Sequence, residues 1–498
     1  MSIEVAKSVT KNAAVLMGSQ AITWTMSFVL MLFLPRYLGS ANYGYLYLAN
    51  SIIGIFIVFI DFGGRYSIAK EISRAPAQAA SIVVNAIGIR FYFWLLSIFV
   101  LIIFIFVAEY PPIVNYLLLL FAIGMLWEGT RKVLWSFYQG TEQMRYPSLG
   151  SISEQIFITF FAVSLLLLGA GVLVIGIVYT LGTFINFFIH AKYARKLITP
   201  LPKYQYSESV KLIKKGIPYF LWSIFGIIYY RVDAIMLSFL TPASVVGWYG
   251  AAYRFFDVLM FIPSIFSIAV FPVLSRLWKS KDTLAATTNK SIDFIIIAGI
   301  PVTIGLYYFA RNITQLFYGI EGYAPSVLIL QIFSIGILLV YIDMILGTAI
   351  LASDKQRQWS IVALFAVIIN VGLNYLAIPF TQNVYHNGGI GSAVATIITE
   401  FFVMVCALFL IPKNTFENGK IGIPIKAISS GIIMAISIKL MNLLLFPWIL
   451  QGIIASIIYV ASLLLLKTLE PAELEFFKNY ISFKNLKQVI LPSKSKQS

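Results

Sequence analysis

Long uninterrupted runs of apolar residues fill this chain almost from end to end, and they decide what it can fold into. Only 11% of the 498 residues are charged, against about a quarter in a typical soluble protein, so lipid must be the main solvent. Only α-helices and closed β-barrels satisfy their backbone hydrogen bonds inside a membrane, and barrels show short alternating segments instead of continuous runs. The sequence therefore predicts an all-α, polytopic membrane protein.

The apolar runs divide into fourteen predicted membrane-spanning helices, each long enough to cross the hydrocarbon core. Two of the breaks rest on little sequence: Gly169-Ala170-Gly171 separates the fifth and sixth spans, and Pro447 separates the last two. The predicted spans are residues 12–34, 43–63, 80–107, 113–138, 147–168, 171–190, 215–240, 246–272, 291–310, 325–351, 358–380, 388–411, 423–446 and 448–466.

Lysine and arginine are unevenly shared between the two sets of predicted loops. Of the 36 basic residues, 28 lie in the amino-terminal segment, in alternate loops or in the tail, whereas the other loops hold only Arg36 and Arg311. Because loops rich in Lys and Arg stay in the cytoplasm, both ends of the chain are predicted to be cytoplasmic, in a cytoplasmic (inner) membrane. The net charge of +16 is therefore interpreted as a topology signal, and no nucleic-acid partner is expected.

The two halves of the chain also resemble each other. A shift of 203 residues aligns Gly44 with Gly247, and a shift of 212 aligns Arg145 with Arg357. Parallel repeats of this kind place a transport pathway between two lobes that rock against each other, although shared apolar composition alone is an alternative explanation. The predicted parts are an N-terminal lobe at 1–191, a basic cytoplasmic linker at 192–215, a C-terminal lobe at 216–411, two extra spans within 412–467 and a basic tail at 468–498 that is either an amphipathic surface helix or disordered.

Charged residues inside the spans are expensive in lipid and normally face protein or water. Arg90 has no acid three or four residues away, and Asp233, two residues from Arg231, cannot share its helical face. We therefore expect both arginines to stand unneutralised in a water-filled cavity, where a guanidinium group suits a phosphate-containing substrate. Carboxylates such as Asp233 and Asp343 instead suit a coupled proton or Na⁺.

Two further charged sets remain open between structural salt bridges and a cavity role. They are Arg254 with Asp257, three residues apart, and Glu128 with Arg131 and Lys132. The complete set of predicted substrate-binding cations is Arg36, Arg90, Arg131, Lys132, Arg231 and Arg254. The predicted ion-coupling candidates are Asp61, Glu154, Asp233, Asp257, Asp343 and Glu400.

No catalytic or metal-binding motif is visible. The single cysteine, Cys406, excludes an intrachain disulfide, and His190 and His386 end distant spans, where they are expected to be interfacial polar groups. Glycine loops of the Walker type, HExxH and GxSxG are absent from the sequence. We therefore predict no enzyme activity, no catalytic residue, no metal site and no cofactor other than a possible coupling to H⁺ or Na⁺.

Short motifs near the start of each half resemble the polysaccharide exporters and O-antigen flippases of the multidrug/oligosaccharidyl-lipid/polysaccharide exporter superfamily. The first-half motifs are Lys11-Asn12, Leu34-Pro35-Arg36-Tyr37-Leu38-Gly39, Asn42-Tyr43-Gly44 and Asp61-Phe62-Gly63. The second-half motifs are Arg231-Val232-Asp233, Val246-Gly247-Trp248-Tyr249, Ala252 and Arg254. In that family the first, second, seventh and eighth spans border the central cavity.

The resemblance implies that the protein moves an undecaprenyl-diphosphate-linked oligosaccharide, for O-antigen or another surface polysaccharide, from the cytoplasmic to the outer leaflet. Besides this lipid and the surrounding membrane lipid, a polysaccharide polymerase and chain-length machinery are possible partners. A cation-coupled multidrug extruder is an alternative that would favour acidic cavity residues. A peptidoglycan-precursor flippase is a second alternative, because the fourteen-span members of the superfamily, which include these flippases, also carry an extra helix pair. A membrane glycosyltransferase or polymerase would need a large outer loop, which this sequence lacks.

Overall fold

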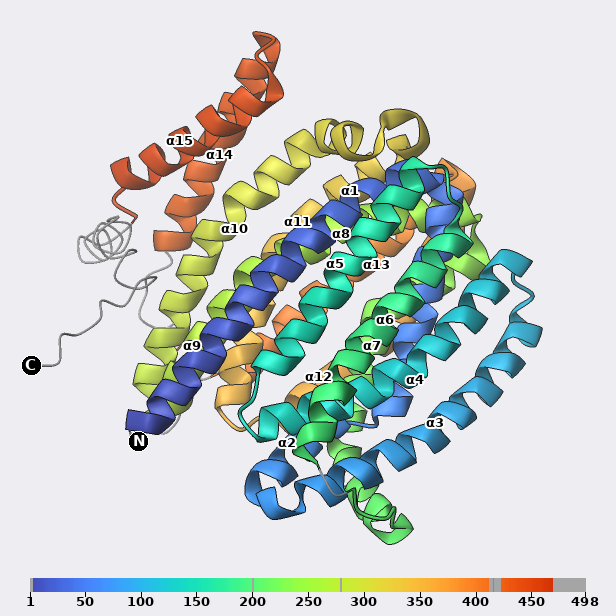
Figure 1. Cartoon of the computed structure of the whole chain (residues 1–498). Coiled ribbons are helices and arrows are strands. Elements are labelled where there is room, and N and C mark those ends of the chain that lie inside the picture. Colours follow the sequence, from blue (N-terminus) through green and yellow to red (C-terminus); the bar gives the residue numbers. More distant parts are fainter. Residues whose placement is uncertain (1–2, 199–200, 278–279, 412–414, 416–421, 469–498) are drawn as a thin grey trace, which may run out of the picture. The chain divides into compact units, whose positions relative to one another are not determined.

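The computed structural model describes residues 3–198, 201–277, 280–411, 415 and 422–468 (Figure 1). Within these ranges all regular structure is helical and no strand occurs. The helices in chain order are α1 (Ile3–Asp61), α2 (Gly64–Arg74), the 3₁₀-helix η1 (Pro76–Gln78), α3 (Ala79–Ala108), α4 (Pro112–Gly140), α5 (Arg145–Leu167), α6 (Val172–Leu197), α7 (Tyr206–Leu240), α8 (Ala243–Leu259), α9 (Phe261–Leu277), α10 (Lys281–Tyr318), α11 (Ile320–Ala352), α12 (Gln356–Tyr385), α13 (Gly388–Leu410), α14 (Gly422–Leu443) and α15 (Trp448–Leu465).

Helix α1 contains two of the predicted spans. Among the described residues, thirteen helical segments are long and apolar enough to cross a membrane, and the first of them, Val15–Asp61, has 47 residues. About 20 residues suffice for one crossing, so this segment crosses twice. The break lies at Gly39, whose φ of 74° and ψ of 165° are not helical, four residues after Pro35. Counting both crossings of α1 confirms the predicted fourteen spans.

The two breaks that rested on little sequence are also confirmed. Helix α5 ends at Leu167 and α6 begins at Val172, and the turn between them uses Gly169 with a φ of 82°. Helix α15 begins at Trp448, directly after Pro447. Proline fits this place because the first helical positions need no backbone N–H donor.

The chain divides into two compact units. One consists of Met1–Phe261, Ala310–Gly336 and Lys355–Cys406, and the other of Ile262–Phe309, Ile337–Asp354 and Ala407–Ser498. These units follow spatial compactness and do not test the repeat, so the lobes at 1–191 and 216–411 and the other predicted domain boundaries stay a prediction. Residues 469–498 of the predicted tail lie outside the described residues.

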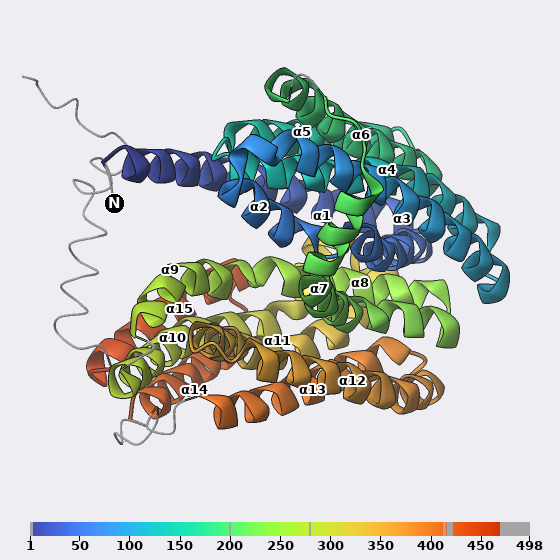
Figure 2. The ribbon, with the colours of Figure 1, turned by 90° about the horizontal axis from the view of Figure 1, so that it is seen from below.

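In the first unit, α1 is the central element. It packs against α4, α5, α7 and α8, while α6 packs on both α4 and α5 (Figures 1 and 2). At the crossing of α1 and α8, a Cβ atom added to Gly44 would lie 2.9 Å from the backbone nitrogen of Gly247. These are the two glycines that the 203-residue shift aligns. Nearer the end of α1, Gly63 approaches α7 so closely that an added Cβ would overlap the carbonyl of Gly216.

The second unit has its own core. Leu274, Leu284, Ala349 and Ala352 form a buried apolar cluster from α9, α10 and α11. Helices α14 and α15 pack against each other, and the hydroxyl of Tyr459 in α15 donates to the carbonyl of Ile297 in α10 at 2.9 Å. The extra helix pair predicted from the sequence is thus anchored to α10.

Candidate functional site

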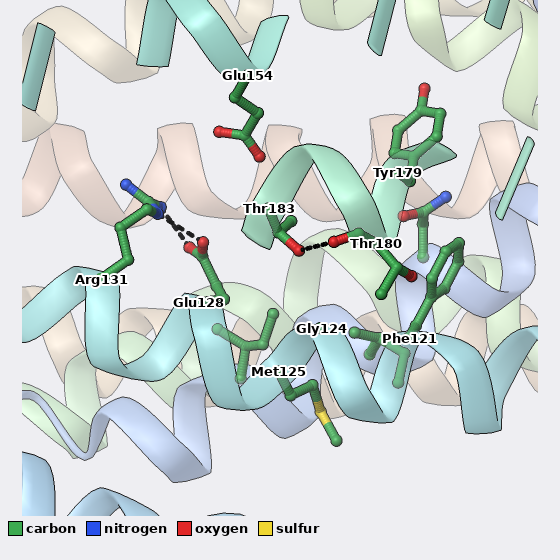
Figure 3. A pocket seen from close by; sticks show the side chains of 12 residues that line it. Phe121, Gly124, Met125, Glu128, Arg131, Glu154, Tyr179, Thr180 and Thr183 are labelled. Atoms are coloured by element: carbon green, nitrogen blue, oxygen red, sulfur yellow. Dashed lines mark hydrogen bonds and ion pairs between the residues drawn. The ribbon is translucent and has the colours of Figure 1, made fainter. Parts of the chain in front are cut away.

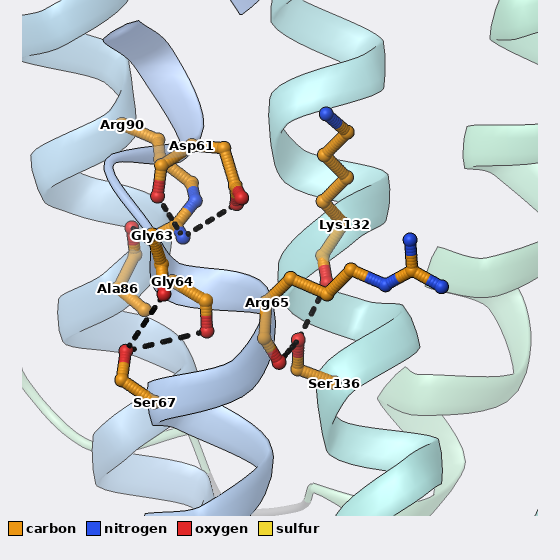
Figure 4. Close-up of polar contacts among 9 residues, drawn as sticks. All are labelled: Asp61, Gly63, Gly64, Arg65, Ser67, Ala86, Arg90, Lys132 and Ser136. Atoms are coloured by element: carbon orange, nitrogen blue, oxygen red, sulfur yellow. Dashed lines mark hydrogen bonds and ion pairs between the residues drawn. The ribbon is translucent and has the colours of Figure 1, made fainter. Parts of the chain in front are cut away.

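Arg90 is paired with Asp61, which corrects the expectation that it stands unneutralised in a cavity (Figure 4). Its Nη2 donates to Oδ1 of Asp61 at 3.1 Å and to the Asp61 carbonyl at 2.9 Å, and its Nη1 donates to the carbonyl of Ala86 at 3.2 Å. The two side chains are only 5% and 12% exposed. Helical spacing could not predict this pair, because the acid comes from a different helix.

A tight turn brings Asp61 to Arg90. Helix α1 ends at Asp61, and Phe62 and Gly63 adopt positive φ angles of 47° and 67° before α2 begins at Gly64. Gly64 lies directly against the guanidinium group of Arg90, because a Cβ added there would meet its Nη2. The Asp61-Phe62-Gly63 motif therefore forms a structural turn that clamps α3 to the end of α1.

A pocket of about 270 Å³ lies in the first unit between α1, α4, α5 and α6 (Figure 3). We call it the glutamate pocket, because two glutamates face it from opposite sides: Glu128 on α4 and Glu154 on α5. Its complete lining is Asn50, Ile53, Ile57, Phe121, Gly124, Met125, Glu128, Arg131, Glu154, Tyr179, Thr180 and Thr183. Two of the predicted site residues, Arg131 and Glu154, thus meet at one cavity.

Glu128 binds Arg131 through both carboxylate oxygens. The Nε of Arg131 donates to Oε2 at 2.7 Å and its Nη2 to Oε1 at 2.5 Å, as the three-residue spacing on one helical face allows. The side chains are 16% and 14% exposed, so the pair remains accessible from the pocket. Lys132, by contrast, forms no ion pair within 4 Å among the described residues. Arg131 is thus salt-bridged on its own helix and also lines the pocket, so its role in substrate binding stays a prediction.

Glu154 is held in place by a second layer of polar residues on α6. Asn186 donates its Nδ2 to Oε2 of Glu154 at 2.5 Å, and the backbone carbonyl oxygen of Asn186 lies 2.9 Å from Nδ1 of His190. His190 is completely buried, beside the rings of Trp135 and Tyr138. Its neighbours on α4 therefore enclose His190, and its place at the membrane interface stays a prediction.

Arg231 on α7 and Arg254 on α8 come from two helices that pack together, and we call these two guanidinium groups the Arg231–Arg254 cluster because both act electrostatically on Asp257. In the described part of the chain, neither arginine makes an ion pair within 4 Å, and the Nε of Arg231 is buried without a hydrogen-bond partner. Both positive charges act on Asp257, and that of Arg254 also acts on Tyr43 and Tyr179. Arg254 and Asp257 thus do not form the ion pair that their spacing allows.

Asp233 lies apart from these cations in a shell of neutral polar groups. Tyr249 and Thr396 donate their hydroxyls to Oδ2 at 2.7 and 2.9 Å, and Asn374 donates its Nδ2 to Oδ1 at 2.7 Å. Asn374 also donates to Oδ1 of Asn370 at 3.0 Å. Sequence reasoning missed Asn370 and Asn374, although two asparagines four residues apart in an apolar span are a usable signal of a polar helical face.

The other predicted residues occupy separate places. Arg36 is exposed and donates to the carbonyl of Leu316 at 3.4 Å. Glu400 is buried and accepts a hydrogen bond of 2.6 Å from the hydroxyl of Tyr229. Asp343 is buried in the second unit, at 6% exposure. Within the described residues no group of three His, Cys, Asp or Glu side chains could hold a metal ion.

Family models match two overlapping parts of the chain. The family described as polysaccharide biosynthesis protein matches residues 9–278, which is more than half of the sequence. The MatE family model matches residues 218–376.

Relatives and solved structures agree with these matches. The probable low-salt glycan biosynthesis flippase Agl15 of Haloferax volcanii is 24% identical over 383 residues, covering 75% of this chain and 77% of the relative. The lipid II flippase MurJ, in an inward closed conformation, superposes with a TM-score of 0.70 at 17% identity, covering 91% of this chain and 98% of MurJ. An inward-facing multidrug resistance MATE transporter of the MOP superfamily superposes with a TM-score of 0.66 at 13% identity, covering 80% and 96%. These structures confirm the predicted fold class.

Proposed function

The chain belongs to the polysaccharide biosynthesis protein family, and we propose that it moves a polyprenyl-diphosphate-linked oligosaccharide from the cytoplasmic to the outer leaflet by alternating access. It is a multi-pass membrane transporter of the MOP flippase type and not an enzyme. The lipid-linked substrate, the direction and the mechanism are the proposal. O-antigen or another surface polysaccharide repeat unit is the glycan that the motifs favour.

The observation that carries the proposal is the pair of guanidinium groups at Arg231 and Arg254. Both lie within membrane-spanning segments, both act electrostatically on Asp257, and neither makes an ion pair within 4 Å among the described residues. A net positive site inside a membrane is costly unless it faces water or an anionic ligand. A diphosphate supplies that anion, and the planar guanidinium group binds phosphate oxygens at two points.

The physical problem that such a site solves is the polar headgroup. Its sugars and diphosphate cannot cross hydrocarbon unaided, because each unpaired polar group costs several kcal/mol in an apolar medium. The polyprenyl tail needs no such shelter and stays in lipid. A cationic cavity that encloses only the headgroup therefore suffices.

Substitution of each arginine tests the proposal. We expect Arg231→Ala and Arg254→Ala each to lower transport of a polyprenyl-diphosphate oligosaccharide in proteoliposomes by at least about tenfold, because a charge-assisted hydrogen bond contributes about 1.5–3 kcal/mol. Neither variant should complement a flippase-deficient strain. Arg311→Ala is the matched control, since Arg311 is exposed near the end of α10. Full activity of both cavity variants, at normal levels in the membrane, would refute the assignment.

We also propose Asp233 as the ion-coupling residue. The hydroxyls of Tyr249 and Thr396 and Nδ2 of Asn374 donate to its carboxylate, and Oδ1 of Asn374 is buried without a hydrogen-bond partner among the described residues. A carboxylate inside a membrane span is a functional-site candidate, because it can take up a proton or offer its oxygens to Na⁺. Transport assays with a Na⁺ gradient and with a pH gradient, each applied alone, identify the ion.

The proteoliposome transport assay also distinguishes the proposed function from two related ones. The MatE family match favours a multidrug extruder, which would transport cationic drugs and ignore lipid-linked sugars. A peptidoglycan-precursor flippase would prefer lipid II to other polyprenyl-diphosphate glycans. The cytoplasmic (inner) membrane location, both ends in the cytoplasm, and a polymerase with chain-length machinery as partners belong to the same proposal.

A further inference from the structure

We propose that the glutamate pocket binds one neutral sugar ring of the lipid-linked glycan, while the Arg231–Arg254 cluster binds its diphosphate. This inference rests on the proposed function and adds a specificity site to it. Three features of the pocket support the inference: the hydrogen-bonding groups on its walls, its volume and the charged residues of its lining.

The walls offer the hydrogen-bonding groups that sugar hydroxyls need. A hydroxyl both donates and accepts, and a carboxylate accepts strong, charge-assisted hydrogen bonds from it. Glu154 and Glu128 supply carboxylates, and the salt bridge uses only two of the five N–H donors of Arg131. Asn50 adds an exposed amide, which donates only to its own helix.

The volume suits one ring. At about 270 Å³ the pocket lies just below the range of about 300–1,000 Å³ that is typical of small-molecule sites, so a whole oligosaccharide does not fit. Gly124 contributes to this space, because it presents no side chain to the pocket. A Cβ atom at this position would lie 3.4 Å from Oγ1 of Thr183, which is an ordinary van der Waals contact, so a side chain can be added there.

The charges on the pocket lining differ from those of the arginine cluster. The lining carries Arg131 and two carboxylates, of which Glu128 is paired with Arg131 and also attracted by Lys132, whereas Glu154 makes no ion pair within 4 Å among the described residues. In the cluster two guanidinium groups act on Asp257. Tyr179 connects the two places, since it lines the pocket and lies within the electrostatic reach of Arg254. A headgroup with a diphosphate at one end and a neutral ring at the other therefore has one favoured orientation, and an acidic sugar is repelled.

The test compares three substrates in proteoliposomes: a polyprenyl diphosphate carrying a hexose, the same lipid carrying a hexuronate, and the lipid without sugar. We expect the native protein to transport the hexose lipid at least about tenfold faster than the hexuronate lipid, which corresponds to about 1.4 kcal/mol. Glu154→Gln keeps the oxygen that accepts from Asn186 but removes one negative charge. It should lower the hexose-to-hexuronate ratio by about tenfold and leave the sugarless lipid unchanged.

Two further variants complete the design. Gly124→Leu fills the pocket without changing charge and should slow only the sugar-bearing lipids, by at least about tenfold. Glu208→Gln is the matched control, because Glu208 forms an exposed surface pair with Lys211 and should leave every rate unchanged.

Equal slowing of all three lipids by Glu154→Gln and Gly124→Leu, or an unchanged substrate ratio, would overturn the sugar site and leave the diphosphate function standing. No transport of any polyprenyl diphosphate by the native protein would overturn the function itself.

Discussion

Removing the positive charge of Arg90 should destabilise the protein strongly. Arg90→Met leaves the carboxylate of Asp61 buried without its cation, and both side chains are almost inaccessible in the native fold, at 5% and 12% exposure. Breaking a buried ion pair from one side costs about 3–5 kcal/mol. At about 2 °C per kcal/mol for a large chain, we expect the Tm in detergent to fall by about 6–10 °C.

A double-mutant cycle separates this structural role from a transport role. Asp61→Asn alone should be similarly destabilising, because it leaves the guanidinium group uncompensated. The double variant Asp61→Asn with Arg90→Met removes both charges and should recover more than half of the lost Tm. Arg311→Met, on the exposed surface, is the control. A native Tm for Arg90→Met, or strict additivity in the double variant, would refute the clamp.

Three other substitutions have defined outcomes. Gly64→Ala should lower the Tm as Arg90→Met does, because the added methyl group displaces the Arg90 guanidinium; an unchanged Tm would contradict this. Gly247→Ala should cost about 1–3 kcal/mol, measured as a lower Tm, because its Cβ would overlap the Ser40 carbonyl. Its control is Gly226→Ala, where an added Cβ meets no atom within 4 Å, and equal Tm values for the two would be inconsistent with a tight crossing. Asp233→Asn should keep the Tm within about 2 °C and make the transport rate independent of the Na⁺ or pH gradient, whereas retained gradient dependence would exclude Asp233 as the coupling residue.

The fold could be predicted from the sequence because lipid permits so few solutions. Backbone groups inside hydrocarbon must bond within their own segment, so apolar length alone predicts each helix. Even the weak breaks at Gly169 and Pro447 were sufficient, since a positive φ and a missing N–H act locally. Local features of the sequence, namely apolar runs and the breaks between them, were therefore enough to predict the fold class and the number of spans.

The candidate site was only partly predictable, because its partners come from different helices. Spacing along one helix correctly allowed the Glu128–Arg131 pair, but it gave no sign that Asp61 would reach Arg90 from 29 residues away. The isolation of Arg231 was predicted on the same local grounds, and it agrees with the structure because no second helix brings an acid within 4 Å among the described residues.

The glycine contacts of α1 have a mechanical consequence. The second half of α1 touches α8 at Gly44, and Gly63 in the turn that follows α1 touches α7, in both places backbone against backbone. Aromatic side chains interlock beside both contacts, because the Tyr47 ring lies directly against Gly250 of α8 and Phe62 stacks on Phe220 of α7. The second half of α1 is therefore held near both of its ends, and moving it away from α7 or α8 requires these rings to leave their partners.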